Sequence, residues 1–249
     1  MDLQNAVAIV TGGTGGLGRC ICRALALTGA HIAVCYAQRQ TEAEAVAQEL
    51  QALGTKAEAV EVDVASAGSV QHLVDHVVRV FGRIDILVND AAYNKWIPFT
   101  QLEDLDLETW TRILNVNLTG PFLLSRAITP VMRAQKRGRI VNVTSIAGLH
   151  PIGSSVAYAV SKAALIHLTK CLAVALAPDI LVNSVAPGFM DGTRMSDNLA
   201  PEYQRKARQG ALLQRAADKN DVAGVVVEFC RTESITGQTL VVDAGRVFH

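Results

Sequence analysis

Short apolar runs alternate with amphipathic stretches along the chain. Seven runs have the length and composition of buried strands, at residues 7–10, 31–35, 57–63, 84–89, 139–145, 180–186 and 239–243. Between them, apolar residues recur at helical spacing, as at Ala43, Val46 and Leu50 and again at Val70, Leu73 and Val77. Gly54 and Gly82 follow these two stretches as C-terminal stops. Strand and helix therefore alternate along the sequence.

This alternation predicts an α/β fold, with a single doubly wound parallel sheet of seven strands, Rossmann-like, and helices on both faces. The chain has 249 residues and shows no repeat, low-complexity tract or linker, so we expect one domain over residues 1–249. The longest irregular stretch, at about 187–215, is too long for a simple connection. It predicts a lid over a binding site.

The distinctive residues follow the predicted strands. A glycine-rich turn comes after the first strand, and the ends of four later strands carry Asp63, Asn89, Ser145 and the pair Pro187-Gly188. Ligands of open α/β sheets bind beyond the carboxyl ends of the strands. Five strand ends thus predict one site at one edge of the sheet.

Charge and cysteine content limit the partners and the compartment. Lys plus Arg equals Asp plus Glu at 23 each, so no basic field favours nucleic acid or an anionic membrane as a partner. The five cysteines are scattered without paired spacing, and the N-terminal apolar run is short for a secretion signal. We expect a cytoplasmic protein. The apolar stretch 163–177 is interrupted by polar residues and predicts a core helix that falls short of membrane-spanning length.

The glycine-rich turn reads TGGTGGLG from Thr11 to Gly18. It can be divided as Gly13-x-Gly15-x-x-Gly18 or as Gly12-x3-Gly16-x-Gly18, and a helix carrying Leu17 follows. In either division the missing side chains let backbone approach a pyrophosphate at a helix N-terminus. The context favours dinucleotide binding over a simple turn.

Residues beyond this turn bear on which dinucleotide binds. NAD-binding folds of this kind carry an acid about 20 residues after the glycines, but no Asp or Glu lies between Gly18 and Glu42. Tyr36 stands near the expected position, and Arg39 could neutralise a 2′-phosphate. The pattern favours NADP(H). NAD stays the alternative, because Arg39 could equally be a solvated loop charge.

Ser145, Tyr158 and Lys162 form the pattern S-x12-Y-x3-K. One helical turn separates Tyr158 from Lys162, so their side chains share a helix face. A phenol with an ordinary pKa of about 10 needs help to act as an acid-base group at neutral pH. An ammonium about 4 Å away would supply about 4 kcal/mol and lower that pKa by about three units. We therefore predict that Tyr158 is a general acid-base catalyst.

These motifs, with Asn89-Asp90-Ala91-Ala92, Asn115-Val116-Asn117 and Asp243-Ala244-Gly245, resemble the short-chain dehydrogenase/reductase family of the compact single-domain type. The resemblance covers nearly the whole chain. Within the family, the chain is similar to 3-oxoacyl carrier-protein reductases and related carbonyl reductases. It implies that Tyr158 exchanges the proton with the substrate oxygen and that Lys162 lowers the tyrosine pKa and binds the nicotinamide ribose. It further implies that Ser145 hydrogen-bonds the substrate oxygen and that Asn117 holds a relay water.

The resemblance also implies a set of cofactor-binding residues and selects the Gly12-x3-Gly16-x-Gly18 division. Together with Tyr158 and Lys162 they are Gly12, Thr14, Gly16, Leu17, Gly18, Arg39, Asp63, Val64, Asn89, Ala91, Pro187, Gly188 and Thr193. Asp90 departs from the asparagine usual in the family, and Gly192 displaces Thr193 by one position. A homotetramer, assembled through helices that begin near Asp106 and Tyr158, is the implied assembly.

We therefore expect an NADP(H)-preferring oxidoreductase that transfers hydride between nicotinamide and a ketone or secondary alcohol. Phe189, Met190, Met195, Leu199 and Tyr203 make the lid apolar and favour an aliphatic, aromatic or acyl-thioester ketone. Asn94, Lys95 and His150 could instead hold a sugar, so an NAD-dependent polyol or sugar dehydrogenase is the alternative.

A protein without enzymatic activity, a non-catalytic dinucleotide-binding sensor or scaffold, is the alternative from another functional class. Such a protein would be expected to lack at least one of the four catalytic groups, but all four are present. His72 and His76 lie four apart, yet no third ligand follows, so we expect a solvated helix face and no metal. The segment from Tyr93 to Phe99 either rims the substrate cleft or packs under a loop.

Overall fold

Seven parallel strands form one sheet in the computed structural model, which describes residues 1–248, and their order is β3-β2-β1-β4-β5-β6-β7. The strands are β1 (Val7–Thr11), β2 (His31–Tyr36), β3 (Ala57–Glu61), β4 (Ile86–Asn89), β5 (Gly138–Val143), β6 (Ile180–Pro187) and β7 (Thr239–Val242). All seven predicted strands are confirmed, with ends that differ by one or two residues.

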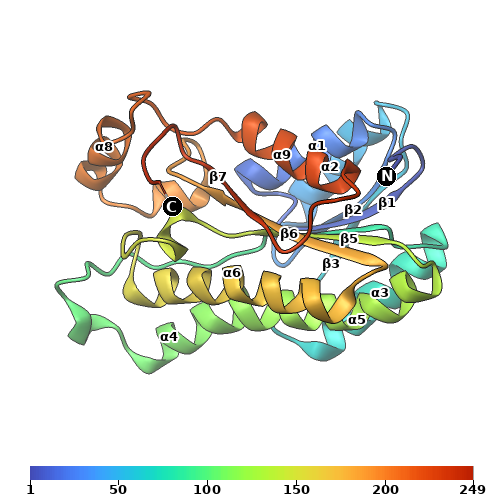
Figure 1. Ribbon diagram of the computed structural model, residues 1–249, viewed down its shortest axis with the longest axis horizontal. Coiled ribbons are helices and arrows are strands. Elements are labelled where there is room, and N and C mark those ends of the chain that lie inside the picture. The colour runs from blue at the N-terminus through green and yellow to red at the C-terminus, as the bar shows by residue number, and fades with distance from the viewer. Residues whose placement is uncertain (249) are drawn as a thin grey trace.

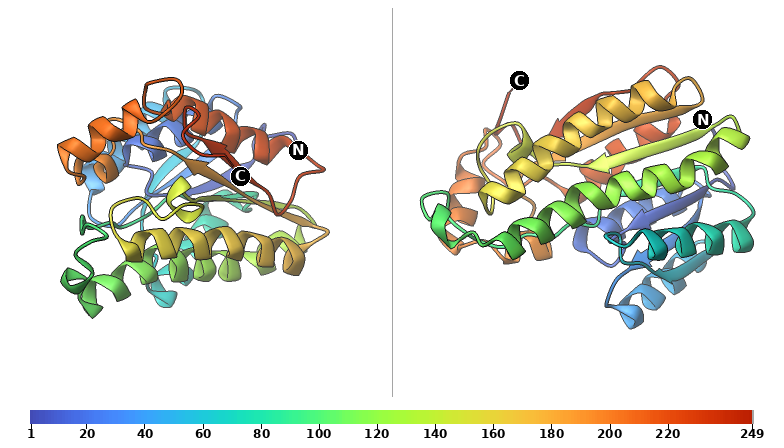
Figure 2. Two further views of the ribbon diagram at one scale, coloured as in Figure 1. Left: turned by 60° about the vertical axis from the view of Figure 1, so that its left-hand side comes forward. Right: turned by 90° about the horizontal axis from the view of Figure 1, so that it is seen from below.

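Helices cover both faces of this sheet (Figure 1). One face carries α1 (Gly16–Ala26), α2 (Gln40–Gln51) and α9 (Lys219–Arg231), and the other carries α3 (Ala67–Phe81), α4 (Leu107–Leu114), α5 (Gly120–Ala134) and α6 (Val156–Leu176). Each layer has its own apolar core against the sheet. The view from below in Figure 2 shows α3, α5 and α6 side by side across one face. The doubly wound fold is thereby confirmed.

The central strands are continuous apolar runs because both of their faces are covered. Every residue of β1 and β5 is buried, and Ile86, Leu87 and Val88 of β4 are fully inaccessible. Strands of parallel sheets read this way, whereas a sheet with one wet face would alternate apolar and polar residues. The apolar runs in the sequence therefore indicate strands in the middle of the sheet.

The helix α6 is longer than the sequence suggested. It runs for 21 residues, and by length and composition alone it could cross a membrane, so the expectation that this stretch is too short is wrong. The prediction of a core helix is confirmed, because α6 packs against β6 and α4 and buries Leu165, Ile166 and Ala173. Its polar members Tyr158 and Lys162 lie on the face turned to the sheet edge.

The predicted lid contains two short helices, α7 (Arg194–Asp197) and α8 (Pro201–Gln209). They project beyond the carboxyl ends of the strands, at the upper left of Figure 1. Thr193 starts α7 with a capping box to Ser196, and Pro201 occupies the first turn of α8, where its missing N–H costs nothing. The cap and the proline set where each helix begins.

At the opposite edge of the sheet, the fully buried carboxylate of Asp85 joins three segments. It accepts hydrogen bonds from Nε of Arg83 at 2.7 Å, from Nη2 of Arg83 at 2.6 Å, and from the backbone N–H of Val7 at 2.9 Å. Nη2 of Arg137, just before β5, lies 3.6 Å from the same carboxylate. Asp85 therefore holds the starts of β1, β4 and β5 together.

Replacing Asp85 by alanine should lower the free energy of unfolding by about 2–3 kcal/mol, because the Val7 N–H loses its acceptor inside the core. The half-exposed Arg83 can regain water, which limits the loss. Urea unfolding measures the change. The matched control is Glu202→Gln, which removes the exposed pair with Lys206 and should leave the unfolding midpoint almost unchanged. Equal effects of the two substitutions would contradict this role for Asp85.

Candidate active site

The carboxyl ends of the strands and the lid enclose a cavity of about 380 Å³, a size typical of small-molecule sites. The cavity lies at the edge of the sheet where the sequence predicts a site. Fourteen of the predicted site residues line it, namely Gly12, Thr14, Gly16, Leu17, Arg39, Asp63, Val64, Ala91, Ser145, Tyr158, Lys162, Pro187, Gly188 and Thr193.

Gly18, Asn89 and Asn117 lie behind this wall. Gly18 packs on the carbonyl of Gly12, with which any Cβ would collide. Asn89 donates from Nδ2 to Oδ1 of Asn142 at 2.8 Å, while its own buried Oδ1 has no hydrogen-bond partner among residues 1–248. These residues lie behind the residues that line the cavity, and Oδ1 of Asn89 is left as a free acceptor among residues 1–248.

The glycine turn forms a tight cradle between β1 and α1. Gly12 has φ +69°, and a Cβ there would lie 3.1 Å from the backbone of Ala91, so only glycine fits. The helix α1 begins at Gly16 without a side-chain cap and without an acid in its first turn. Its first N–H groups are therefore available to an anion. The cradle fits a dinucleotide pyrophosphate, and the positive φ of Gly12 together with the collision of a Gly16 Cβ with the carbonyl of Gly192 supports the division Gly12-x3-Gly16-x-Gly18.

Tyr158 and Lys162 lie in the first two turns of α6. Ser155 caps this helix by accepting a hydrogen bond from the N–H of Tyr158 at 3.2 Å. The Lys162 side chain is buried, and its Nζ donates to the carbonyl of Val143, the last residue of β5, at 2.8 Å. Nζ lies 5.8 Å from the centroid of the Tyr158 ring. Both side chains thus point to the cavity from one helix face, as their spacing predicts.

The predicted lowering of the tyrosine pKa is wrong for this structure. Burial raises the pKa of Tyr158 to about 12, opposed by a hydrogen bond from the Ser145 hydroxyl and reinforced by the nearby Tyr203 and Asp90. Burial likewise lowers the pKa of Lys162 to about 8, while Asp90 raises it. Desolvation is the largest cause of both shifts, and the ammonium donates to the carbonyl of Val143 rather than to the phenol.

Ser145 follows β5 and faces the same cavity. Its Oγ accepts a hydrogen bond from the N–H of Ala147 at 3.1 Å and caps the short turn Ile146–Gly148. That contact orients the hydroxyl, whose one proton can be donated to the Tyr158 oxygen or to a substrate oxygen. Ser145, Tyr158 and Lys162 therefore come together around one space, although β5 and α6 supply them separately.

Asn117 lies in a π-helical turn, Asn115–Thr119, between α4 and α5. Its Oδ1 accepts from the N–H of Tyr93 at 2.8 Å, and its Nδ2 donates to the carbonyl of Tyr93 and to Oγ of Ser161, both at 3.0 Å. The side chain therefore fixes the loop after β4 to α6. The role of holding a relay water stays a prediction.

Thr193 lines the cavity but uses its hydroxyl to start α7. Oγ1 accepts from the N–H of Ser196 at 3.1 Å and lies 3.1 Å from Oγ of the same serine. A contact with a nicotinamide carboxamide would compete with these bonds. That assignment also stays a prediction.

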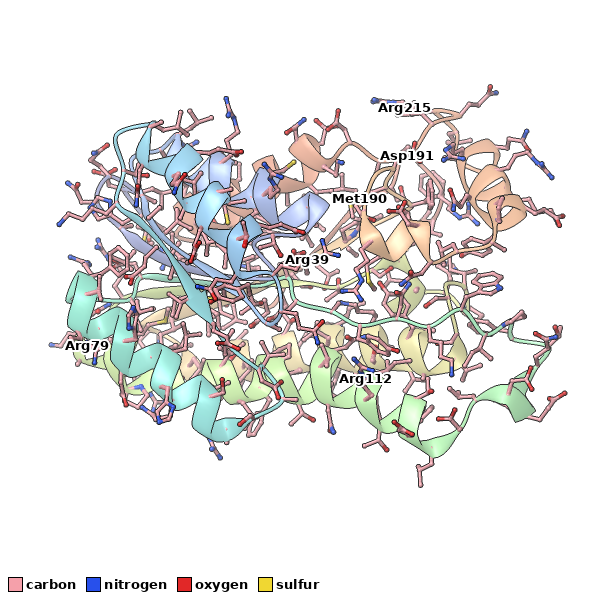
Figure 3. The ribbon with its side chains drawn as sticks, turned by 180° about the vertical axis from the view of Figure 1, so that it is seen from behind. Arg39, Arg79, Arg112, Met190, Asp191 and Arg215 are labelled. Atoms are coloured by element: carbon pink, nitrogen blue, oxygen red, sulfur yellow. The ribbon has the colours of Figure 1, made fainter. Side chains whose placement is uncertain are left out.

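The lid and the loop after β4 form the remaining wall (Figure 3). All five apolar lid residues named from the sequence line it, together with Tyr93 and Asn94. The guanidinium of Arg112, labelled on α4 in Figure 3, lies 4.2 Å from the centroid of the Tyr93 ring. Sequence reasoning missed several residues of this wall, among them Arg112, Ile152, Gly153, Ser154 and Arg246. No motif marks them, except that Gly153 and Ser154 closely precede Tyr158.

Comparison with known proteins matches these features to one family. A family model for short chain dehydrogenases matches residues 6–204. A 3-oxoacyl-[acyl-carrier-protein] reductase of Synechocystis sp. is 41% identical over 250 residues, covering 98% of each chain.

Two solved structures are also similar. The NADPH-dependent 3-quinuclidinone reductase of Rhodotorula rubra has a TM-score of 0.91 at 27% identity and covers 98% of this chain and 92% of its own. An NAD⁺-bound xylitol dehydrogenase has a TM-score of 0.90 at 30% identity and covers 98% and 100%. The chain therefore belongs to the short-chain dehydrogenase/reductase family, as an oxidoreductase that acts on C=O or CH–OH groups.

Proposed function

We propose that this protein is an NADP(H)-preferring oxidoreductase that transfers hydride between nicotinamide and a ketone or secondary alcohol. The observation that carries the proposal is the meeting of Ser145, Tyr158 and Lys162 in the same cavity as the glycine cradle. A scaffold or sensor would have no need to keep three catalytic groups beside a dinucleotide cradle. That alternative is therefore disfavoured.

The bound dinucleotide would supply the hydride, and the protein supplies binding, orientation and the proton. In reduction the Tyr158 hydroxyl donates its proton to the carbonyl oxygen, and Ser145 stabilises the charge that develops there. A phenol with a pKa of about 12 is protonated at neutral pH, as a proton donor must be. Lys162 and the cradle from Gly12 to Gly18 would hold the cofactor.

The preference for NADP(H) rests on the end of β2. Tyr36, Ala37, Gln38 and Arg39 line the cavity there, and none of them repels a 2′-phosphate. Nη1 of Arg39 lies 3.0 Å from Oε2 of Glu42, and both side chains are about half exposed. A 2′-phosphate would therefore compete with Glu42 for Arg39. The preference should be real but limited by this pair.

Asp90 places a carboxylate beside the cradle. A Cβ on Gly18 would lie 3.0 Å from its Oδ2, and no hydrogen bond to its carboxylate is found within residues 1–248. Burial raises the pKa of Asp90 to about 7, partly offset by the charge of Lys162. An ionised Asp90 would repel the cofactor phosphates. Cofactor affinity should therefore depend on the protonation of this group near neutral pH.

The cavity wall favours an apolar ketone over a polyol. Asn94, one of three groups that could grip a sugar, donates from Nδ2 to the carbonyl of Met195 at 3.0 Å and accepts from Asn198 at 2.9 Å. Lys95 lies 3.2 Å from Oγ1 of Thr109, and His150 is exposed and outside the cavity wall. The likeness to xylitol dehydrogenase keeps an NAD-dependent polyol or sugar dehydrogenase as the second candidate.

The likeness to a 3-oxoacyl-[acyl-carrier-protein] reductase is consistent with an acyl-thioester among the apolar ketones.

We also propose a homotetramer, supported by exposed apolar side chains on α5 and α6 at Phe122, Val160 and Val174. The five cysteines are free, which supports a reducing cytoplasm. Neither nucleic acid nor a membrane is proposed as a partner, because the chain has no net charge.

Replacing Tyr158 by phenylalanine should lower kcat by roughly 10²- to 10⁴-fold, because the general acid is lost while the ring stays. Ketone reduction followed by NADPH absorbance measures kcat. Fluorescence titration with NADPH should give an unchanged Kd, and the melting temperature controls for folding. Turnover close to that of the wild type would refute Tyr158 as proton donor.

Replacing Glu42 by glutamine should tighten NADPH binding by roughly three- to tenfold, because Arg39 is freed for the 2′-phosphate. Replacing Arg39 by glutamine should weaken NADPH by a similar factor, while NADH affinity is unaffected in both variants. Separate fluorescence titrations with the two cofactors test this. Equal wild-type affinity for NADPH and NADH, with no response to either variant, would exclude the proposed preference.

Cofactor affinity should fall as the pH rises from 6 to 8, because Asp90 loses its proton near pH 7 and Lys162 loses its charge near pH 8. Both changes disfavour an anionic ligand. Replacing Asp90 by asparagine should tighten NADPH binding at pH 8 by roughly fivefold, because one repulsion between the carboxylate and the cofactor phosphates is removed. It should also make the Kd less dependent on pH near pH 7. Titration of the variant at four pH values measures this. A wild-type Kd constant across the range would rule out a titrating Asp90.

A further inference from the structure

Tyr203 brings a second phenol from the lid into the site. It lies on α8, lines the cavity, and accepts a hydrogen bond at its hydroxyl from the N–H of Gly153 at 3.0 Å. Its ring meets that of Trp96 edge-on, with centroids 5.2 Å apart and planes at 63°. The lid is thereby tied to the segment that precedes α6.

Gly153 lies beside Tyr158 and beside Ala147, in the turn that Ser145 caps. It has φ +114°, and a Cβ there would lie 3.3 Å from Cδ1 of Tyr158 and 3.1 Å from Cβ of Ala147. The N–H of Ala147 in turn donates to Oγ of Ser145 at 3.1 Å. A movement of Gly153 would therefore be felt by the ring of Tyr158 and by the turn that orients Ser145.

The lid has a second attachment that does not use Tyr203. Asn94 binds the carbonyl of Met195 and the side chain of Asn198, and Gln204 donates to the carbonyls of Ser196 and Leu199. The Asn94 bonds attach the lid to the loop after β4, and the Gln204 bonds join α8 to α7 within the lid. The hydroxyl of Tyr203 thus has a separate effect, which is to hold Gly153 in place.

We propose that Tyr203 is a positioning residue, which fixes Gly153 against Tyr158 when the lid is closed and so couples lid closure to proton transfer. This inference rests on the proposed function. Tyr203 acts through Gly153 and need not touch the reacting atoms. Since proton transfer requires hydrogen-bond geometry, a loose Tyr158 ring would slow the chemical step.

Two readouts are specific to this role. The Tyr203 hydroxyl accepts from the N–H of Gly153, so its loss should speed hydrogen exchange there and lower kcat rather than raise KM. A change that only loosened the lid would alter KM and leave the exchange of Gly153 unchanged.

The test is Tyr203→Phe in the full-length protein, which keeps the ring against Trp96 and removes only the acceptor. Hydrogen exchange of a peptide covering residues 149–158 should become faster, because the Gly153 N–H loses its partner. With ketone and NADPH, kcat should fall by roughly three- to tenfold, about the effect of one hydrogen bond, with unchanged NADPH Kd and melting temperature.

Gln204→Leu is the matched control on the same helix. It removes the bonds to Ser196 and Leu199 and should alter KM, while hydrogen exchange at 149–158 and kcat stay as in the wild type. Unchanged exchange in Tyr203→Phe, or an unchanged kcat, would overturn the inference and leave the proposed function intact. A wild type that turns over no ketone or alcohol would instead overturn both.

Discussion

The hydrogen bond from Lys162 Nζ to the carbonyl of Val143 joins the helix of the catalytic tyrosine to the end of a central strand. It is buried, and it spans two elements that the sequence separates by 19 residues. Through it the first turns of α6 keep a fixed distance from Ser145, two residues beyond Val143. The same strand end lies beside the glycine cradle, because β1, β4 and β5 are neighbours in one parallel sheet. The groups proposed for proton transfer and the cradle proposed for the cofactor thus meet at one packed junction.

Burial at this junction decides the electrostatics of the site. An ammonium one helical turn from a phenol would make it more acidic in a wet environment, but here desolvation penalises the charged forms of both. The tyrosine keeps its proton, and the lysine holds its charge less firmly. Asp90 enters the same balance, since its carboxylate and the Lys162 ammonium each favour the charged form of the other. A bound dinucleotide would add phosphate charge to this set, so the three groups must respond together.

The lid completes the site from the other side. Its backbone at Gly192 packs directly on Gly16 of the cradle, where any Cβ would collide, and its helix α8 reaches the segment before α6 through Tyr203. Cofactor cradle, lid and catalytic helix are therefore in mutual contact. Polar side chains that a sequence reader would offer to the substrate, such as Asn94, are used to hold this closed arrangement. The surface left to the substrate is correspondingly more apolar.

The sequence by itself determined the fold and most of the site. Apolar runs located all seven strands, because strands of a parallel sheet covered by helices are rich in apolar residues. The site followed from topology, because the carboxyl ends of parallel strands meet at one edge of the sheet. The glycine spacing and the S-x12-Y-x3-K pattern likewise placed the cradle and the three catalytic groups in one cavity. Each of these inferences depends on local periodicity or on topology, which a linear sequence records.

Only the tertiary structure decided how these groups are charged, oriented and shared. The sequence could not show that Lys162 bonds Val143, that Glu42 competes for Arg39, or that Arg112 and Gly153 belong to the wall. Nor could it reveal the capped helices of the lid or the full length of α6. The reason is physical: burial and contact between distant segments set pKa values and hydrogen-bond partners, and neither quantity is a property of residue spacing.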